Sequence, residues 1–85
     1  MTNKLEILKK RLIYRASYRG TKEIDILLGS FVNKYINNFD EAHLTDLEKF
    51  LSLEDEVILN FYQHNITEKE INKNKISNLF KKFKI

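Results

Sequence analysis

Apolar residues recur at spacings of three and four along this chain, and no proline and only two glycines interrupt them in 85 residues. This spacing places apolar side chains on one face of an α-helix, whereas strict alternation would indicate strands. Because proline is the strongest helix breaker, its absence favours helices throughout. The sequence therefore predicts an all-α fold, a small bundle of about five short helices in one domain over residues 1–85.

The positions of these helices follow from the apolar stripes and the capping residues. We expect helices over about residues 5–18, 24–37, 45–51, 54–64 and 68–83. Thr45–Glu48 and Thr67–Glu70 have the form of capping boxes, so they predict the starts of the third and fifth helices. Ser52 is the expected cap of the fourth helix.

Charge is distributed unevenly, although the net charge is only +3. Residues 1–22 carry seven basic side chains against Glu6 alone, and residues 40–56 carry seven acidic side chains against Lys49. The segment from Ile71 onwards is again purely basic. Oppositely charged faces suit docking onto a charged partner, because they steer the encounter.

Catalysis and metal binding have little support in the sequence. The absence of cysteine excludes disulfides, thiolate metal sites and a cysteine nucleophile. His43 and His64 lie far apart without metal-ligand spacing, so no metal site is expected. No serine or histidine has a recognisable nucleophile setting and no glycine loop for phosphate is present, so no catalytic residue is expected either.

No apolar run approaches the roughly 18 to 20 residues that span a bilayer, so we expect no membrane insertion. The basic, amphipathic N-terminus resembles a mitochondrial transit peptide, but Glu6 interrupts it and it continues directly into the next motif. We interpret it as the first helix of the mature fold. This interpretation predicts a bacterial cytoplasmic protein.

The first two predicted helices meet at Arg19-Gly20-Thr21. Gly20 is suited to end the first helix in a left-handed conformation, and Thr21 to cap the second. We expect Arg19 to project from this corner beside uncovered backbone, and Glu23 to pair with a basic residue of the first helix. Such a corner is a rigid surface that a partner can approach closely. Gly29, inside the second apolar stripe, predicts a bend or a close helix contact.

The two basic ends leave a nucleic-acid-binding or antitoxin-like regulator as an alternative. A helix-turn-helix would place its turn at Arg19-Gly20 and use the second helix for recognition. That helix is a poor reader of bases, because Glu23 and Asp25 in its first turn would face phosphates. We therefore expect no nucleic-acid partner. A general structural interaction module is a third possibility.

Residues 11–31, RLIYRASYRGTKEIDILLGSF, resemble the signature of the succinate dehydrogenase flavinylation factors, the FAD assembly factor (SdhE) family of bacteria and mitochondria. That signature is an Arg-Gly-x-x-Glu element, here Arg19, Gly20 and Glu23. The flanking positions that fit the family pattern are Arg11, Tyr14, Ser17, Asp25, Leu28 and Phe31. A second block, LTDLEKFLSLEDEVILNFYQ, resembles the family's capped helix, acidic link and apolar helix, and the resemblance covers about residues 5–64.

The resemblance implies a small helical bundle that is not an enzyme and binds no FAD stably. Family members bind the flavoprotein subunit of succinate dehydrogenase, in some bacteria that of fumarate reductase, and promote covalent attachment of FAD to a histidine of that subunit. The implied partner-binding residues are Arg15, Arg19, Gly20 and Glu23, and the implied supporting residues are Arg11, Tyr14, Ser17 and Asp25. Arg19 would also stabilise negative charge on the flavin.

Two features depart from the family pattern. The family usually has tryptophan at the position of Phe61. Residues 71–85 match no family feature, so we expect residues 67–85 to form a basic C-terminal helix or tail specific to a lineage.

Overall fold

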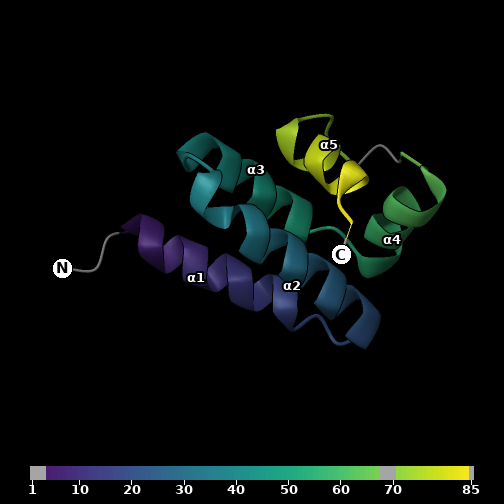
Figure 1. Ribbon diagram of the computed structural model, residues 1–85, viewed down its shortest axis with the longest axis horizontal. Helices are drawn as coiled ribbons and strands as arrows, with labels where there is room; N and C mark the ends of the chain where they lie inside the picture. Colours follow the sequence, from purple (N-terminus) through teal and green to yellow (C-terminus); the bar gives the residue numbers. More distant parts are fainter. Residues whose placement is uncertain (1–3, 68–70, 85) are drawn as a thin grey trace.

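Five α-helices and one short 3-10 helix are present in the computed structural model, which describes residues 4–67 and 71–84 (Figure 1). In chain order the elements are α1 Lys4–Ser17, α2 Lys22–Tyr35, η1 Ile36–Asn38, α3 Glu41–Leu51, α4 Asp55–His64 and α5 Lys75–Lys82. Neither described range contains a strand. The predicted all-α fold of about five short helices is confirmed.

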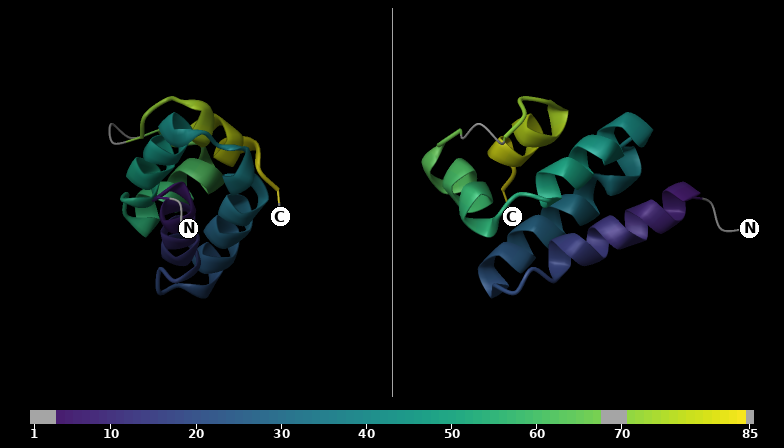
Figure 2. Two further views of the ribbon diagram at one scale, coloured as in Figure 1. Left: turned by 90° about the vertical axis from the view of Figure 1, so that its left-hand side faces the viewer. Right: turned by 180° about the vertical axis from the view of Figure 1, so that it is seen from behind.

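The first two helices, α1 and α2, form an antiparallel hairpin to which the other helices are added (Figure 1). α3 packs against α1, and α5 packs against both α3 and α4. The start of α1 and the whole of α4 lie at opposite ends of an elongated molecule of 43 × 26 × 20 Å (Figure 2). The corner between α1 and α2 therefore lies at the α4 end.

The start of α3 differs from the prediction. Asp40 caps the helix, and its Oδ1 accepts a 2.8 Å hydrogen bond from the backbone N–H of His43. Thr45, the predicted cap, lies inside α3 and donates its hydroxyl to the carbonyl oxygen of Glu41. The prediction at Thr45 was wrong because Asp40 is also a good cap and starts the helix five residues earlier, which adds the buried Leu44 to the apolar face.

The predicted fourth helix is confirmed as α4, Asp55–His64, but its predicted cap is wrong. Ser52 is instead the C-terminal cap of α3, and its hydroxyl donates to the carbonyl oxygen of Glu48. Glu54 is the first residue before α4, and its side chain makes no capping hydrogen bond. A serine between two helices can donate its hydroxyl to an unpaired carbonyl group at the end of the first helix, or accept from an unpaired N–H group at the start of the second. Its presence in the sequence therefore does not show which of the two helices it caps.

The last helix, α5, begins at Lys75, so the predicted start at residue 68 was wrong. Asn74 and Ser77 form its capping box through hydrogen bonds of 3.1 and 3.0 Å. Residues 71–74 are not helical, although Ile71 is buried. Most of the predicted Thr67–Glu70 box lies outside the described residues.

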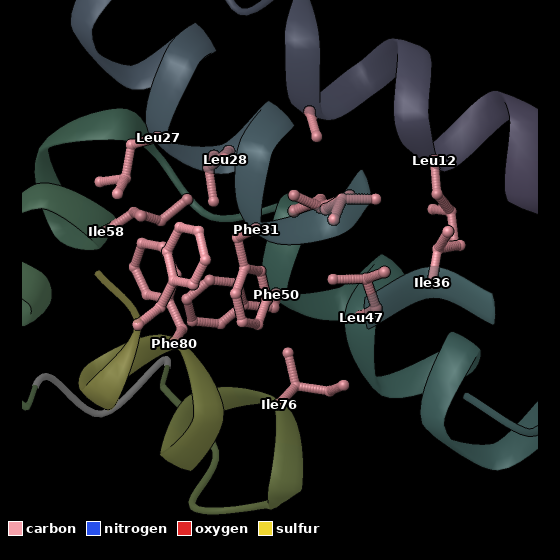
Figure 3. Close-up of a cluster of buried hydrophobic side chains, with 14 of the residues drawn as sticks. Leu12, Leu27, Leu28, Phe31, Ile36, Leu47, Phe50, Ile58, Ile76 and Phe80 are labelled. Atoms are coloured by element: carbon pink, nitrogen blue, oxygen red, sulfur yellow. The ribbon is translucent and has the colours of Figure 1, made fainter. Parts of the chain in front are cut away.

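Three phenylalanines from α2, α3 and α5 form the centre of the core (Figure 3). The ring of Phe80 lies 5.1 Å from that of Phe31 and 5.2 Å from that of Phe50, centroid to centroid, in edge-to-face contact. Phe61 is buried and contacts Phe50 from α4. Because Ile76 and Phe80 of α5 are fully buried, the C-terminal helix is part of the packed fold.

Candidate functional site

The corner between α1 and α2 turns through a glycine in a left-handed conformation. Gly20 has φ +110°, and a Cβ built on it would meet no other atom within 4 Å. The left-handed conformation expected at Gly20 is confirmed, and few other residues adopt such a φ, but α1 already ends at Ser17, three residues earlier. Thr21 is the N-cap residue of α2, as expected, but its side chain makes no capping hydrogen bond. The backbone at Gly20 is consequently open to solvent and to a partner.

Asp25 fixes the corner from the first turn of α2. Its Oδ1 accepts a 2.6 Å hydrogen bond from the backbone N–H of Arg19. A carboxylate at this end of a helix also interacts favourably with the helix dipole. In the sequence, Asp25 stood out as an obstacle to phosphate binding, whereas the structure gives its side chain a role in the turn itself.

The guanidinium of Arg19 faces inward and not outward as expected. The side chain is only 12% exposed. Nε donates to Oδ1 of Asp55 at 2.6 Å, Nη1 donates to the carbonyl oxygen of Leu51 at 2.6 Å, and Nη2 donates to that of Leu53 at 2.5 Å. Leu51 ends α3 and Asp55 begins α4. Arg19 therefore ties the α1–α2 corner to the α3–α4 link.

Glu23 contacts α4 and not the first helix. Its Oε1 accepts a 2.9 Å hydrogen bond from Nε2 of Gln63, and both residues are exposed. The predicted pairing of Glu23 with a basic residue of the first helix is wrong, because the arginines of α1 contact Glu48 of α3 instead. Glu23 nevertheless lies on the surface beside the corner, where its second oxygen is open to other contacts.

Arg11 and Arg15 lie on the side of α1 that faces α3. Nη2 of Arg11 lies 3.7 Å from Oε2 of Glu48, and Nη1 of Arg15 lies 3.9 Å from the same oxygen. Nη2 of Arg15 also donates to the hydroxyl of Ser52 at 3.3 Å. These contacts are long and the side chains are 62% and 37% exposed, so they contribute little to stability. Both guanidinium groups remain accessible to a partner.

Two tyrosines at the end of α1 face solvent and not the core. Tyr14 and Tyr18 are 65% and 69% exposed, and their ring centroids are 4.6 Å apart. Residues four positions apart meet on one side of a helix, so the two rings form a single exposed aromatic surface. Tyr14 was identified from the resemblance, but Tyr18 was not. The sequence does contain the relevant information, because Tyr18 follows Tyr14 by four residues, the spacing that brings two side chains together on one side of a helix.

Ser17 of α1 lies close to Gly29 of α2. A Cβ at Gly29 would lie 3.0 Å from Oγ of Ser17. The prediction of a close helix contact at Gly29 is confirmed, because only a residue without a side chain leaves this distance comfortable. Ser17 thus has a packing role.

The residues of the motif fall into two groups. Arg19, Ser17 and Asp25 hold the corner in place, whereas Tyr18 and Gly20 are exposed at its surface. Sequence reasoning missed the partners of Arg19, which are Asp55 and the carbonyl groups of Leu51 and Leu53. No local signal reveals a contact between residues 36 positions apart.

The described part of the chain presents an exposed surface at the corner between α1 and α2. Within residues 4–67 and 71–84, no three His, Cys, Asp or Glu side chains gather as metal ligands would. None of the helices in these ranges has the length and hydropathy needed to cross a bilayer. An open glycine backbone beside exposed aromatic rings is typical of a docking surface.

Comparison with known proteins identifies relatives of one kind. Residues 10–84 match the model of the family described as the flavinator of succinate dehydrogenase, so the match extends through α5, beyond the range of about 5–64 expected from the resemblance. No solved structure matches.

Curated relatives match a shorter part of the chain. The mitochondrial succinate dehydrogenase assembly factor 2 of Scheffersomyces stipitis is 45% identical over 47 residues, which are 55% of this chain and 32% of that protein. The FAD assembly factor SdhE of Acetobacter pasteurianus is 43% identical over 47 residues, 55% of this chain and 43% of that protein. The mitochondrial assembly factor 2 of Dictyostelium discoideum is 37% identical over 59 residues, 69% of this chain and 42% of that protein.

These matches span less than half the length of each of the three relatives. A nucleic-acid-binding or antitoxin-like regulator is not favoured by any of them. The family model, in contrast, covers both the Arg-Gly-x-x-Glu corner and the core helices that hold it. The chain belongs to the flavinator of succinate dehydrogenase family.

Proposed function

We propose that this chain is an assembly factor that binds the flavoprotein subunit of succinate dehydrogenase and promotes the covalent attachment of FAD to it. The observation that carries the proposal is the family match over residues 10–84. The names of the Acetobacter pasteurianus and Scheffersomyces stipitis relatives support the same role. The flavoprotein subunit of fumarate reductase is a second candidate partner, and the bacterial cytoplasm is the proposed compartment.

The contact surface in this proposal is the exposed part of the corner. A Cβ added at Gly20 would have no neighbouring atom within 4 Å, so a partner's backbone can approach it closely. Tyr18 and Glu23 flank it, and both are exposed. Arg15 lies in the last turn of α1, four residues before Arg19, and retains an accessible guanidinium. These residues supply apolar area and charge of both signs within one small region.

Arg19 has a positioning role in the proposal. Its guanidinium already donates to three oxygens of the α3–α4 link, so reaching a flavin would require all three hydrogen bonds to break. Each hydrogen bond to a charged group contributes about 1.5 to 3 kcal/mol. Direct stabilisation of a flavin charge by Arg19 is therefore disfavoured, and the residue fixes the shape that Gly20 presents.

The proposed mechanism is restriction of geometry and not catalysis by the factor. The subunit supplies the histidine and the flavin, and the factor holds the subunit in a conformation where the two meet. Restricting reacting groups in this way contributes up to about 7 to 11 kcal/mol in favourable cases. The factor itself is neither an enzyme nor a stable carrier of FAD in this account.

The proposal is tested by reconstitution. The purified chain is mixed with FAD and with the folded apo flavoprotein subunit encoded by the same genome, and flavin fluorescence of the denatured subunit is followed over time. The expected result is covalent flavin that accumulates faster than in the control without the factor. Equal rates with and without the factor would contradict the proposal.

A further inference from the structure

The exposed corner is smaller than a specific interface requires. Stable complexes bury about 800 Å² on each partner and involve roughly 20 to 30 residues a side. The corner supplies only the few exposed residues around Gly20. A docking surface centred there must therefore extend along one of the elements that meet at the corner.

The outward face of α1 carries the apolar surface needed for such an extension. Ile7, Tyr14 and Tyr18 are 51%, 65% and 69% exposed. Their spacing of seven and four residues places Ile7 and Tyr14 on one side of α1, opposite the fully buried Leu12 and Ala16. Tyr18 directly follows α1 and continues this side, because its backbone N–H donates to the carbonyl oxygen of Tyr14. At 1.5 Å per residue this outward stripe is about 16 Å long and ends at the corner. In Figure 1, α1 lies at the edge of the molecule with α2 and α3 on one side of it.

The remaining elements offer no comparable stripe. Among the described residues, Ile26 and Ile66 are the other large hydrophobic side chains with high exposure, and they lie on separate elements. Scattered exposed apolar residues are ordinary, whereas three in register on one helix face are not. The outward stripe is therefore the direction in which the docking surface extends.

Basic side chains flank the outward stripe. Lys10 and Arg11 lie beside it on α1, and Lys22 follows the corner. No ion pair is found for Lys10 or Lys22 within residues 4–67 and 71–84, and Arg11 has only the 3.7 Å contact with Glu48. The charge beside the stripe is thus available to a partner.

The basic charge beside the stripe indicates which kind of partner can bind there. A second copy of the chain would bring two basic faces together, which is unfavourable. A membrane surface needs more apolar area than three side chains provide. An acidic protein surface with apolar side chains at its centre matches both the charge and the tyrosine rings, which bury large area at low cost in side-chain entropy.

We propose that the outward stripe of α1, Ile7, Tyr14 and Tyr18 with Lys10 and Arg11, docks onto an acidic surface of the flavoprotein subunit that has apolar side chains at its centre. This inference rests on the proposed function. It adds a contact that begins at the corner and continues for three turns of α1, away from the Arg-Gly-x-x-Glu element. The basic flanks accelerate association, and the apolar stripe slows dissociation.

The test compares dissociation constants of variants for the purified apo flavoprotein subunit. Ile7→Gln and Tyr14→Gln remove apolar surface from the stripe, and glutamine preserves helix propensity. Ile66→Gln is the matched control, because Ile66 is 47% exposed and lies in the segment after α4, which contributes no residue to the stripe. Thermal unfolding of each variant checks that the fold is unchanged.

The expected result is at least tenfold weaker binding for Ile7→Gln and Tyr14→Gln, and unchanged binding for Ile66→Gln. Lys10→Glu should lower the association rate several-fold at low salt and much less at high salt. Unchanged binding by both stripe variants, with binding lost in Gly20→Val, would overturn the inference and leave the proposed function standing. Failure of the wild-type chain to bind the subunit overturns both. Loss of self-association or of binding to anionic vesicles in the stripe variants, with subunit binding unchanged, also overturns the inference.

Discussion

The guanidinium of Arg19 donates a 2.6 Å hydrogen bond from Nε to Oδ1 of Asp55, a residue 36 positions further along the chain. The same group donates to the carbonyl oxygens of Leu51 and Leu53. One side chain thus joins the α1–α2 corner to the end of α3 and the start of α4. This arrangement makes the arginine of the Arg-Gly-x-x-Glu element a structural residue that determines how its glycine is presented.

Arg19→Ala should destabilise the fold by about 3 to 5 kcal/mol, because three partly buried oxygens lose their donor at once. For a domain of this size the unfolding midpoint would fall by about 10 °C or more. Arg19→Lys should be intermediate, since one ammonium cannot replace the planar fork of three donors. Thermal denaturation followed by circular dichroism measures both. Arg11→Ala is the control, with a change within about 0.5 kcal/mol.

Asp55→Ala separates a positioning role of Arg19 from a contact role. If Arg19 acts by holding the corner, Asp55→Ala should weaken binding to the flavoprotein subunit in the same direction as Arg19→Ala, although Asp55 lies on another helix. If Arg19 binds the partner directly, Asp55→Ala frees the guanidinium and binding stays equal or improves. Titration calorimetry with the apo subunit distinguishes the two outcomes.

The order of helices could be read from the sequence, but their starts could not. Asp40, Thr45 and Ser52 are all good caps by composition, and the choice between them depends on which apolar residues the neighbouring helices bury. The glycine of the corner was predictable because its conformation is local. The inward orientation of Arg19 was not, because it depends on carbonyl groups that α3 brings into place.

Gly20→Ala should cost about 1 to 2 kcal/mol in stability, through backbone strain at φ +110° and not through a clash, because the space around the position is open. Gly20→Asn should cost less, since asparagine tolerates left-handed backbone better than alanine does. Chemical denaturation curves measure the difference. Equal stability of all three proteins would show that the glycine is not required by the fold.

Gly29→Ala should show coupling to Ser17. In the wild-type chain the new Cβ would lie 3.0 Å from Oγ of Ser17, a strain that offsets the gain in helix propensity of about 1 kcal/mol. In a Ser17→Ala background that oxygen is absent, so the same substitution should be more favourable by about 0.5 to 1 kcal/mol. A double-mutant cycle from unfolding free energies gives the coupling. Additive effects would mean that α1 and α2 have separated enough to admit a methyl group.

Phe80→Ala should destabilise the protein by about 3 to 5 kcal/mol. The ring is fully buried and contacts those of Phe31 and Phe50, so its loss opens a cavity between α2, α3 and α5. Exposed Lys82→Ala on the same helix is the control and should have little effect. A small loss in Phe80→Ala would show that α5 is an appendage to an otherwise complete fold.

We propose that this chain promotes flavin attachment through the surface that Gly20 presents. The most direct measurement is the covalent flavin content of the succinate dehydrogenase flavoprotein subunit in cells that lack the chain and carry wild-type, Gly20→Val or Ile66→Gln copies at equal abundance. Covalent flavin is expected with the wild-type and Ile66→Gln copies, and little is expected with Gly20→Val. Covalent flavin that is the same in all strains, including the strain without any copy, would contradict it.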